Sequence, residues 1–139
     1  MTPAQSNLRS ARILHLFFLT AAFLYIFVLI QIRPSEKPLD SIVIGAIAIV
    51  CLIVIGVALF LRSRMISESA TKLSTNPEDT EALRTWRSGQ IISFTFAETV
   101  VLFGFVLKVL GARWNVAGSF FVVGILLLVA WRPKLDVSS

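Results

Sequence analysis

Residues 90–111 form an apolar run, QIISFTFAETVVLFGFVLKVLG, that holds a single carboxylate, Glu98, near its middle. Arg87 and Lys108 lie on either side of Glu98, and at the helical rise they are about 31 Å apart, close to the thickness of a bilayer's hydrocarbon core. The run therefore predicts a membrane-spanning helix with Glu98 near the midplane. Because an ionisable group at that depth costs at least about 2.5 kcal/mol, Glu98 is a candidate functional residue.

Three further apolar runs have lengths typical of membrane spans. The chain is 56% hydrophobic and only 15% charged, whereas soluble domains average about 25% charged residues. We predict an all-α integral membrane protein with one domain, residues 1–139, folded as a four-transmembrane-helix bundle. The expected spans are residues 13–32, 42–61, 91–110 and 116–131. The first run is too long for a typical signal-peptide hydrophobic region, so we interpret it as a retained span.

The polar segments contain further helix signals. Residues 1–10 are polar, and we expect them to be frayed. In the loop 62–90, apolar and small residues from Met65 to Leu73 recur at helical spacing, so the second helix is expected to continue beyond the membrane. Asn76 and Pro77 then fit the cap and first turn of a new helix that runs into the third span.

Lysine and arginine counts predict the orientation. Nine of these cations flank the spans on the side of the two termini and the loop 62–90, and four lie on the other side. By the positive-inside rule, both termini and the helical loop are cytoplasmic, which indicates a plasma (inner) membrane protein. Trp86 and Trp131 would then lie at the inner interface and Trp114 at the outer one.

A weak internal repeat suggests a second organisation of the same spans. The segment Leu8–Arg12, LRSAR, resembles Leu83–Arg87, LRTWR, 75 residues later. A true repeat would make the four-helix bundle two tandem helical hairpins in parallel orientation.

Small residues mark a packing face on the third span. At 100° per residue they fall within a stripe about 80° wide, and Glu98 lies on a different face. Small residues along one face let another helix approach closely. The predicted helix-packing residues are Gly89, Ser93, Ala97, Gly104 and Gly111.

No cation matches Glu98 in both depth and face, so we expect its carboxyl to be protonated. At its depth the first span offers Thr20 and Tyr25, and Thr95 lies one turn before it. We take Glu98, Thr95 and Thr20 as a candidate proton- or ion-binding set. Two other interpretations stay open: a neutral, hydrogen-bonded packing group, and a contact with another subunit.

The sequence around Glu98 also resembles a known family. Phe96-Ala97-Glu98, followed by Leu102, Gly104 and Phe105-Val106-Leu107, is similar to the ion-carrying helix of the rotary ATPase proteolipid (c subunit) family. The resemblance covers residues 96–107 and implies that Glu98 binds a transported proton or sodium ion. A longer loop, a fourth span and the lack of a dense glycine repeat distinguish this chain from that family.

Other function classes have little support in the sequence. The single Cys51 and the single His15 leave no disulfide framework and no metal-ligand spacing. No nucleophile–base pair or phosphate loop occurs, so we expect no catalytic residue, cofactor or enzymatic activity. The cations lie at the ends of apolar runs, which argues against nucleic acid.

Two functions follow from these patterns. The first is a structural or accessory subunit of a membrane complex, whose partners are the lipid bilayer and other membrane subunits or copies of itself. The second is a protein that binds protons or cations through Glu98.

Overall fold

The computed structural model describes residues 2–33 and 37–135, which form helices, turns and irregular segments, with no strand in these two ranges. The predicted all-α fold is confirmed for these ranges. Three helical segments are long and apolar enough to cross a membrane: residues 3–31, 41–75 and 80–109. The elements are α1 (Pro3–Gln31), α2 (Ser41–Arg62), the π-helical turn η1 (Ser63–Ser67), α3 (Glu68–Thr75), α4 (Thr80–Val109) and α5 (Trp114–Ala130).

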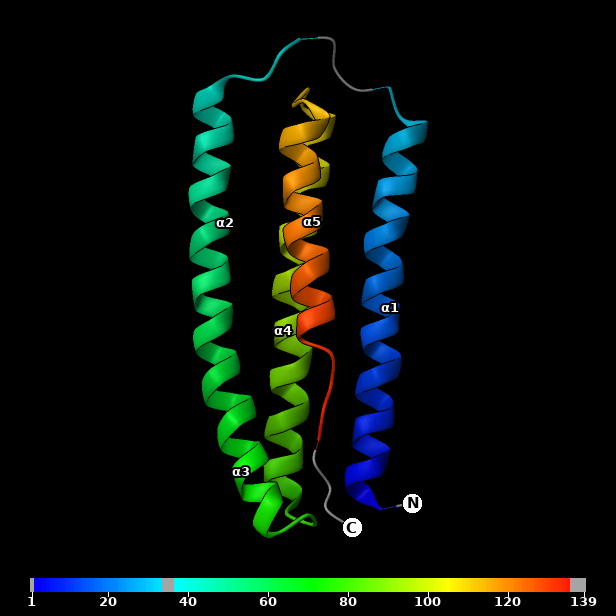
Figure 1. Ribbon diagram of the computed structural model, residues 1–139, viewed down its shortest axis with the longest axis vertical. Helices are drawn as coiled ribbons and strands as arrows, with labels where there is room; N and C mark the ends of the chain where they lie inside the picture. Colours follow the sequence, from blue (N-terminus) through cyan, green and yellow to red (C-terminus); the bar gives the residue numbers. More distant parts are fainter. Residues whose placement is uncertain (1, 34–36, 136–139) are drawn as a thin grey trace.

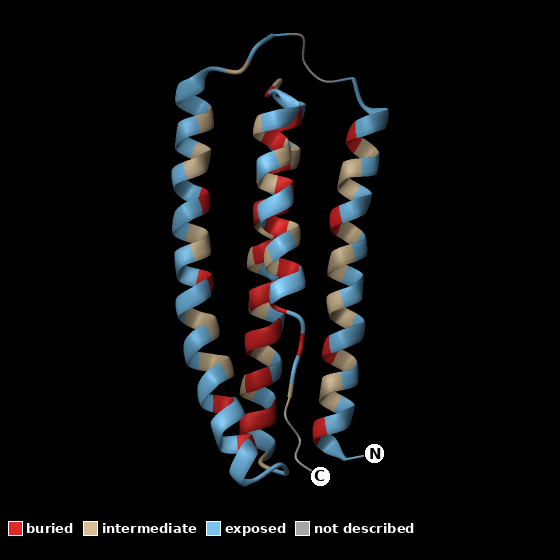
Figure 2. Cartoon of the chain, in the orientation of Figure 1, coloured by how far each residue is buried: buried red, intermediate tan, exposed pale blue. Residues whose placement is uncertain are grey.

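Helix α4 is the centre of the molecule. It lies between α1 and α2, and α5 packs along it (Figure 1). Fourteen of its 30 residues are buried, whereas α2 buries only two of 22 (Figure 2). Within the described ranges α1 and α2 do not touch, so the first two long helices are not a packed hairpin, unlike α4 and α5.

Helix α1 begins much earlier than its apolar run. The Thr2 hydroxyl accepts a hydrogen bond from the Gln5 amide at 3.3 Å, and the Gln5 side chain accepts one from the Thr2 amide at 3.1 Å. This capping box, with Pro3 in the first turn, starts the helix at Pro3. The expectation of a frayed N-terminal segment was therefore wrong for its described part, residues 2–10.

A second hydrophobic core holds the polar end of the bundle together. It joins the start of α1 to α3 and to the first turns of α4, below the core to which α1, α2, α4 and α5 contribute (Figure 1). Its buried members are Ala4, Ala11, Leu73, Ala82, Leu83 and Trp86. Helix α2 continues through η1 into α3, which supplies Leu73 to this core.

The start of α4 corrects a second prediction. The Asn76 carbonyl accepts from the Asp79 amide at 3.2 Å, which closes a four-residue turn with Pro77 at its second position. The Asp79 carboxylate then accepts from the Glu81 and Ala82 amides at 3.1 Å each. Asp79, not Asn76, caps the helix, because Asn-Pro fits a turn as well as a helix start.

Helix α4 ends in a glycine turn that redirects the chain into α5. Gly111 has a φ of 106°, and the amides of Gly111 and Ala112 donate to the carbonyls of Lys108 and Leu107 at 3.1 and 2.9 Å. The Lys108 ammonium donates to the Ala112 carbonyl at 3.0 Å and lies 4.9 Å from the centre of the Trp114 ring. The expectation that Gly111 belongs to a helix face was wrong, since the helix ends before it.

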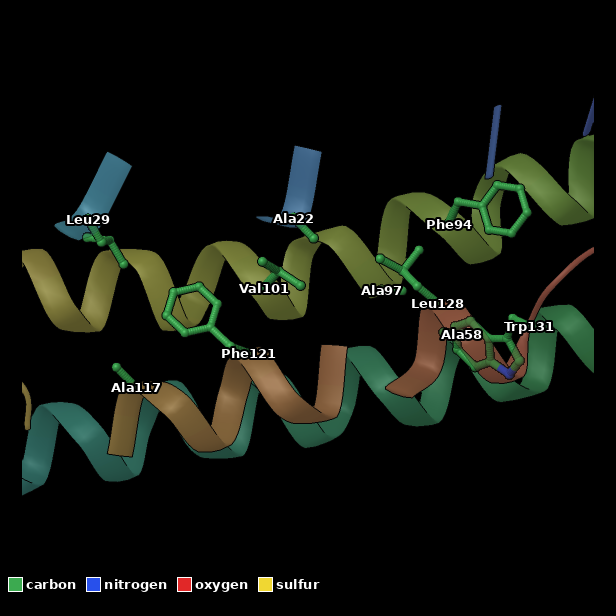
Figure 3. Packing of buried hydrophobic residues seen from close by; sticks show 10 residues of the cluster. All are labelled: Ala22, Leu29, Ala58, Phe94, Ala97, Val101, Ala117, Phe121, Leu128 and Trp131. Carbon is green, nitrogen blue, oxygen red and sulfur yellow. The ribbon is translucent and has the colours of Figure 1, made fainter. Parts of the chain in front are cut away.

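The α4–α5 contact is close enough to exclude side chains. A Cβ at Gly104 would lie 3.0 Å from the Ala117 carbonyl oxygen, and one at Gly124 would lie 3.2 Å from the Ala97 carbonyl oxygen. Around these glycines, side chains from both helices fill the core (Figure 3). The α1 face of α4 packs against Ala22 and Leu29 of α1, which belong to the same core.

Candidate functional site

Glu98 is buried where α4 packs against α1. Its side chain is only 7% exposed, and the Tyr25 hydroxyl of α1 is the polar group that faces its carboxyl. Neither carboxyl oxygen completes a hydrogen bond with a described residue. Glu98 is therefore a buried polar group with unused hydrogen-bonding capacity, which is costly in an apolar setting.

Aromatic rings surround this carboxyl on the α1 side of α4. Phe94, one turn before Glu98, is fully buried, and its ring centre lies 5.1 Å from that of His15 and 5.9 Å from that of Phe18. Phe105, two turns after Glu98, lies 5.8 Å from the Tyr25 ring. These rings make the contact between the two helices largely apolar on both sides of Glu98.

The structure does not bring the predicted threonines to Glu98. Thr20 and Thr95 are exposed on the outside of the bundle. The Thr20 hydroxyl donates to the Leu16 carbonyl at 2.8 Å, and the Thr95 hydroxyl donates to the Ile91 carbonyl at 2.9 Å. Both groups are satisfied within their own helices, as hydroxyls in helices often are, so the expected set of Glu98, Thr95 and Thr20 does not form.

Tyr25 is the site residue that the sequence-based set omitted, although it lies at a suitable depth. It is three residues after Ala22 and four before Leu29, both buried against α4, so helical spacing places it on the same face. Its long side chain leans toward the N-terminal end of α1, which carries the hydroxyl to the level of Glu98. Its spacing from Ala22 and Leu29 identifies Tyr25 only once the burial of those two residues against α4 is known.

The four helical members of the small-residue stripe are all buried, but they face two different neighbours. A Cβ at Gly89 would lie 2.9 Å from Ile66 of η1, and the Ser93 hydroxyl accepts from the Arg62 guanidinium at 3.3 Å. Ala97 and Gly104 instead contact α5. The stripe therefore lets both the α2–η1 segment and α5 approach α4 closely.

His15 joins α1 to the end of α5. Its Nε2 donates to the Leu128 carbonyl at 2.5 Å, one of the last carbonyls of α5, which have no partner within their own helix. Near the same level, the Arg62 guanidinium lies 5.4 Å from the centre of the Trp131 ring. These two links hold α1, α2 and α5 together at the end of the bundle that carries both chain termini.

The described residues contain no group of three or more histidine, cysteine, aspartate or glutamate side chains that could hold a metal ion. Glu98 has Tyr25 as its polar neighbour, so the arrangement can bind or release a proton at one carboxyl. Comparisons with protein-family models, curated proteins and solved structures find no match to this chain.

Proposed function

We propose that this protein is a non-enzymatic, four-span accessory subunit of a membrane complex, with both termini and residues 62–90 in the cytoplasm. Helix α5 has 17 residues, about 25 Å at the helical rise, and with Trp131 it approaches the hydrocarbon thickness of about 30 Å. The nine-to-four excess of lysine and arginine on the terminal side supports the orientation and the plasma (inner) membrane location.

The observation that carries the accessory role is the exposure of α2. Only Cys51 and Ala58 of this helix are buried, and a Cβ at Gly45 or Gly56 would meet nothing within 4 Å. These two glycines are about three turns apart and so share a face. Small residues in a membrane helix favour close contact with another helix, and none of the described helices supplies that contact.

Purification of the tagged full-length chain in a mild detergent, followed by native mass determination, tests this role. We expect a second membrane protein in fixed stoichiometry. Gly45→Leu together with Gly56→Leu should release it, because leucine at both positions blocks the close approach. Gly118→Leu is the matched control, since Gly118 of α5 also has open space above it. Recovery of the chain alone, or only with copies of itself, would contradict the accessory role.

Cysteine accessibility tests the orientation. In a Cys51→Ser background, a cysteine at Ser6 should react with an impermeant reagent only after the cells are opened, and a cysteine at Ser41 should react in intact cells. The reverse pattern would invert the proposed topology.

A second candidate function, proton or cation binding at Glu98, is favoured by a different observation. Two buried carboxyl oxygens have no hydrogen-bond partner among the described residues, although buried polar groups usually have one. The resemblance of residues 96–107 to the proteolipid helix points to the same chemistry. A bound proton would let the carboxyl donate a hydrogen bond instead of carrying a charge in apolar surroundings.

An apolar carbodiimide distinguishes this candidate, because it reacts with protonated carboxyls inside membranes. We expect labelling at Glu98 at neutral pH, weaker labelling at alkaline pH and none in Glu98→Gln. Glu98→Gln should preserve assembly in both candidates, but it should abolish proton or cation uptake only if Glu98 binds the ion. Labelling of water-exposed Glu81 in place of Glu98 would count against a protonated carboxyl in the bundle.

A further inference from the structure

A basic cavity lies at the end of the bundle that carries the chain termini. Its volume is about 470 Å³, and it lies between α1 and the segment that follows α5, which runs toward the N-terminal end of α1 (Figure 1). The cavity is lined by Arg12, His15, Leu16, Arg132, Pro133 and Lys134. It is distinct from the Glu98 site, which lies deeper in the bundle.

The lining of this cavity is positively charged, and none of the described residues forms an ion pair with its cations. Four of its six residues are basic and none is acidic. Across residues 2–33 and 37–135, Arg12, Arg132 and Lys134 form no ion pair. His15 is fixed by its bond to the Leu128 carbonyl, so it holds the α1 wall of the cavity against the end of α5. Three cations around one cavity, none paired with an acidic group in the described ranges, create a field that attracts an anion.

The cavity also lies at the level where a membrane meets water. The part of α1 from Arg12 to its end at Gln31 is about 28 Å long at the helical rise, close to the hydrocarbon thickness, so Arg12 marks one boundary of the α1 span. Trp131, directly before Arg132, is a residue type common at this interface. Leu16 lines the cavity and is 61% exposed, and the next residue, Phe17, is 69% exposed. An occupant would therefore meet cations at one end and an apolar surface at the other.

We propose that this cavity binds the phosphate group of an anionic phospholipid, whose acyl chains lie along the exposed apolar face of α1. Arginine side chains bind phosphate oxygens through paired, charge-assisted hydrogen bonds. Basic pockets at this depth are suited to lipid headgroups. A free phosphate ion would satisfy the same cations, but it would leave the apolar wall at Leu16 without a partner.

Native mass spectrometry of the delipidated full-length protein in detergent tests the proposal. Phosphatidylglycerol, phosphatidylcholine and inorganic phosphate are titrated in separate arms. We expect phosphatidylglycerol to bind at least about tenfold more tightly than phosphatidylcholine, and Arg12→Gln and Arg132→Gln each to weaken it about tenfold, the size expected for losing a charged hydrogen-bond donor. Inorganic phosphate should neither bind with comparable affinity nor displace the lipid.

Arg9→Gln is the matched control, because Arg9 is an exposed cation on the same helix, one turn from Arg12 and outside the cavity. We expect it to change the affinity less than about threefold, below the effect of one surface cation near a membrane. Lys134 lies after the end of α5, so Lys134→Gln should weaken phosphatidylglycerol binding without affecting helix formation. Equal losses in Arg9→Gln and Arg12→Gln, equal binding of phosphatidylcholine, or displacement by inorganic phosphate would each overturn the proposal.

Discussion

Replacing Gly124 by alanine should destabilise the bundle more than the same replacement at Gly118, the other glycine of α5. The added Cβ would collide with the Val101 side chain and lie 3.1 Å from the Val101 amide nitrogen and 3.2 Å from the Ala97 carbonyl oxygen. Carbon atoms in contact prefer separations of about 3.5–4.0 Å. The alanine can therefore fit only if α4 and α5 move apart or if Val101 changes its rotamer.

The cost follows from the stiffness of this contact. Valine in a helix has one strongly preferred χ1 rotamer, and Val101 is fully buried, so rotation offers little relief. Overpacking of this kind typically costs about 1–3 kcal/mol, and we expect the loss in unfolding free energy to fall in that range. Val101→Ala removes the colliding methyl groups. The loss of unfolding free energy in the double variant should therefore be smaller than the sum of the losses in the two single variants.

Unfolding of the detergent-solubilised protein by increasing sodium dodecyl sulfate, followed by helical circular dichroism, measures these free energies. Gly118→Ala is the control, because the same methyl group on the same helix meets open space. Equal stability of Gly124→Ala and Gly118→Ala would refute the close α4–α5 contact. Additive losses in the Gly124→Ala, Val101→Ala pair would refute the collision as its cause.

Three further predictions use the same assay. His15→Phe keeps a ring against Phe94 but leaves the Leu128 carbonyl without its donor, so we expect a loss of about 1–3 kcal/mol; an unchanged stability would show that this hydrogen bond contributes nothing. Gly111→Ala forces a side chain into a φ of 106° and should cost about 1 kcal/mol, whereas an effect no larger than that of Gly118→Ala would contradict the strain. Asp79→Ala should cost about 1 kcal/mol and Asp79→Asn much less, because asparagine can still cap the helix; equal losses would exclude capping.

The presence and approximate extent of the long apolar helices could be predicted from the sequence, because an apolar run of about 20 residues favours a helix of spanning length. The run around Glu98 and the run in α1 both lie inside helices of sufficient length. Helix ends were harder to predict. Thr2 and Gln5 form a capping box that the polar composition of residues 1–10 concealed, and Asp79 lies only three residues after Asn76, an equally good capping residue.

The rotation of each helix about its own axis was much less predictable, and the candidate site depends on it. Thr20 and Tyr25 of α1 both lie near the depth of Glu98, yet only Tyr25 faces it. Ala22 and Leu29 define the face of α1 that meets α4. Their burial can be recognised only when the position of the partner helix is known. The absence of an α1–α2 contact likewise depends on α4 packing between them, and a single helix sequence carries no such information.

Glu98 connects the two proposed functions through its charge state. The aromatic rings near Glu98 and the Tyr25 hydroxyl provide no positive charge, and apolar surroundings of this kind disfavour the ionised form of a carboxyl group. A cation from outside the chain would favour ionisation if it lay close to the boundary between α1 and α4. Such a cation could be a bound metal ion or a lysine or arginine of a partner subunit. Infrared spectroscopy of the carboxyl group, before and after removal of bound partners, therefore separates the cases. A neutral acid in both states supports packing alone, a neutral acid that ionises only with a partner supports a subunit contact, and an ionised acid that depends on added sodium supports ion binding.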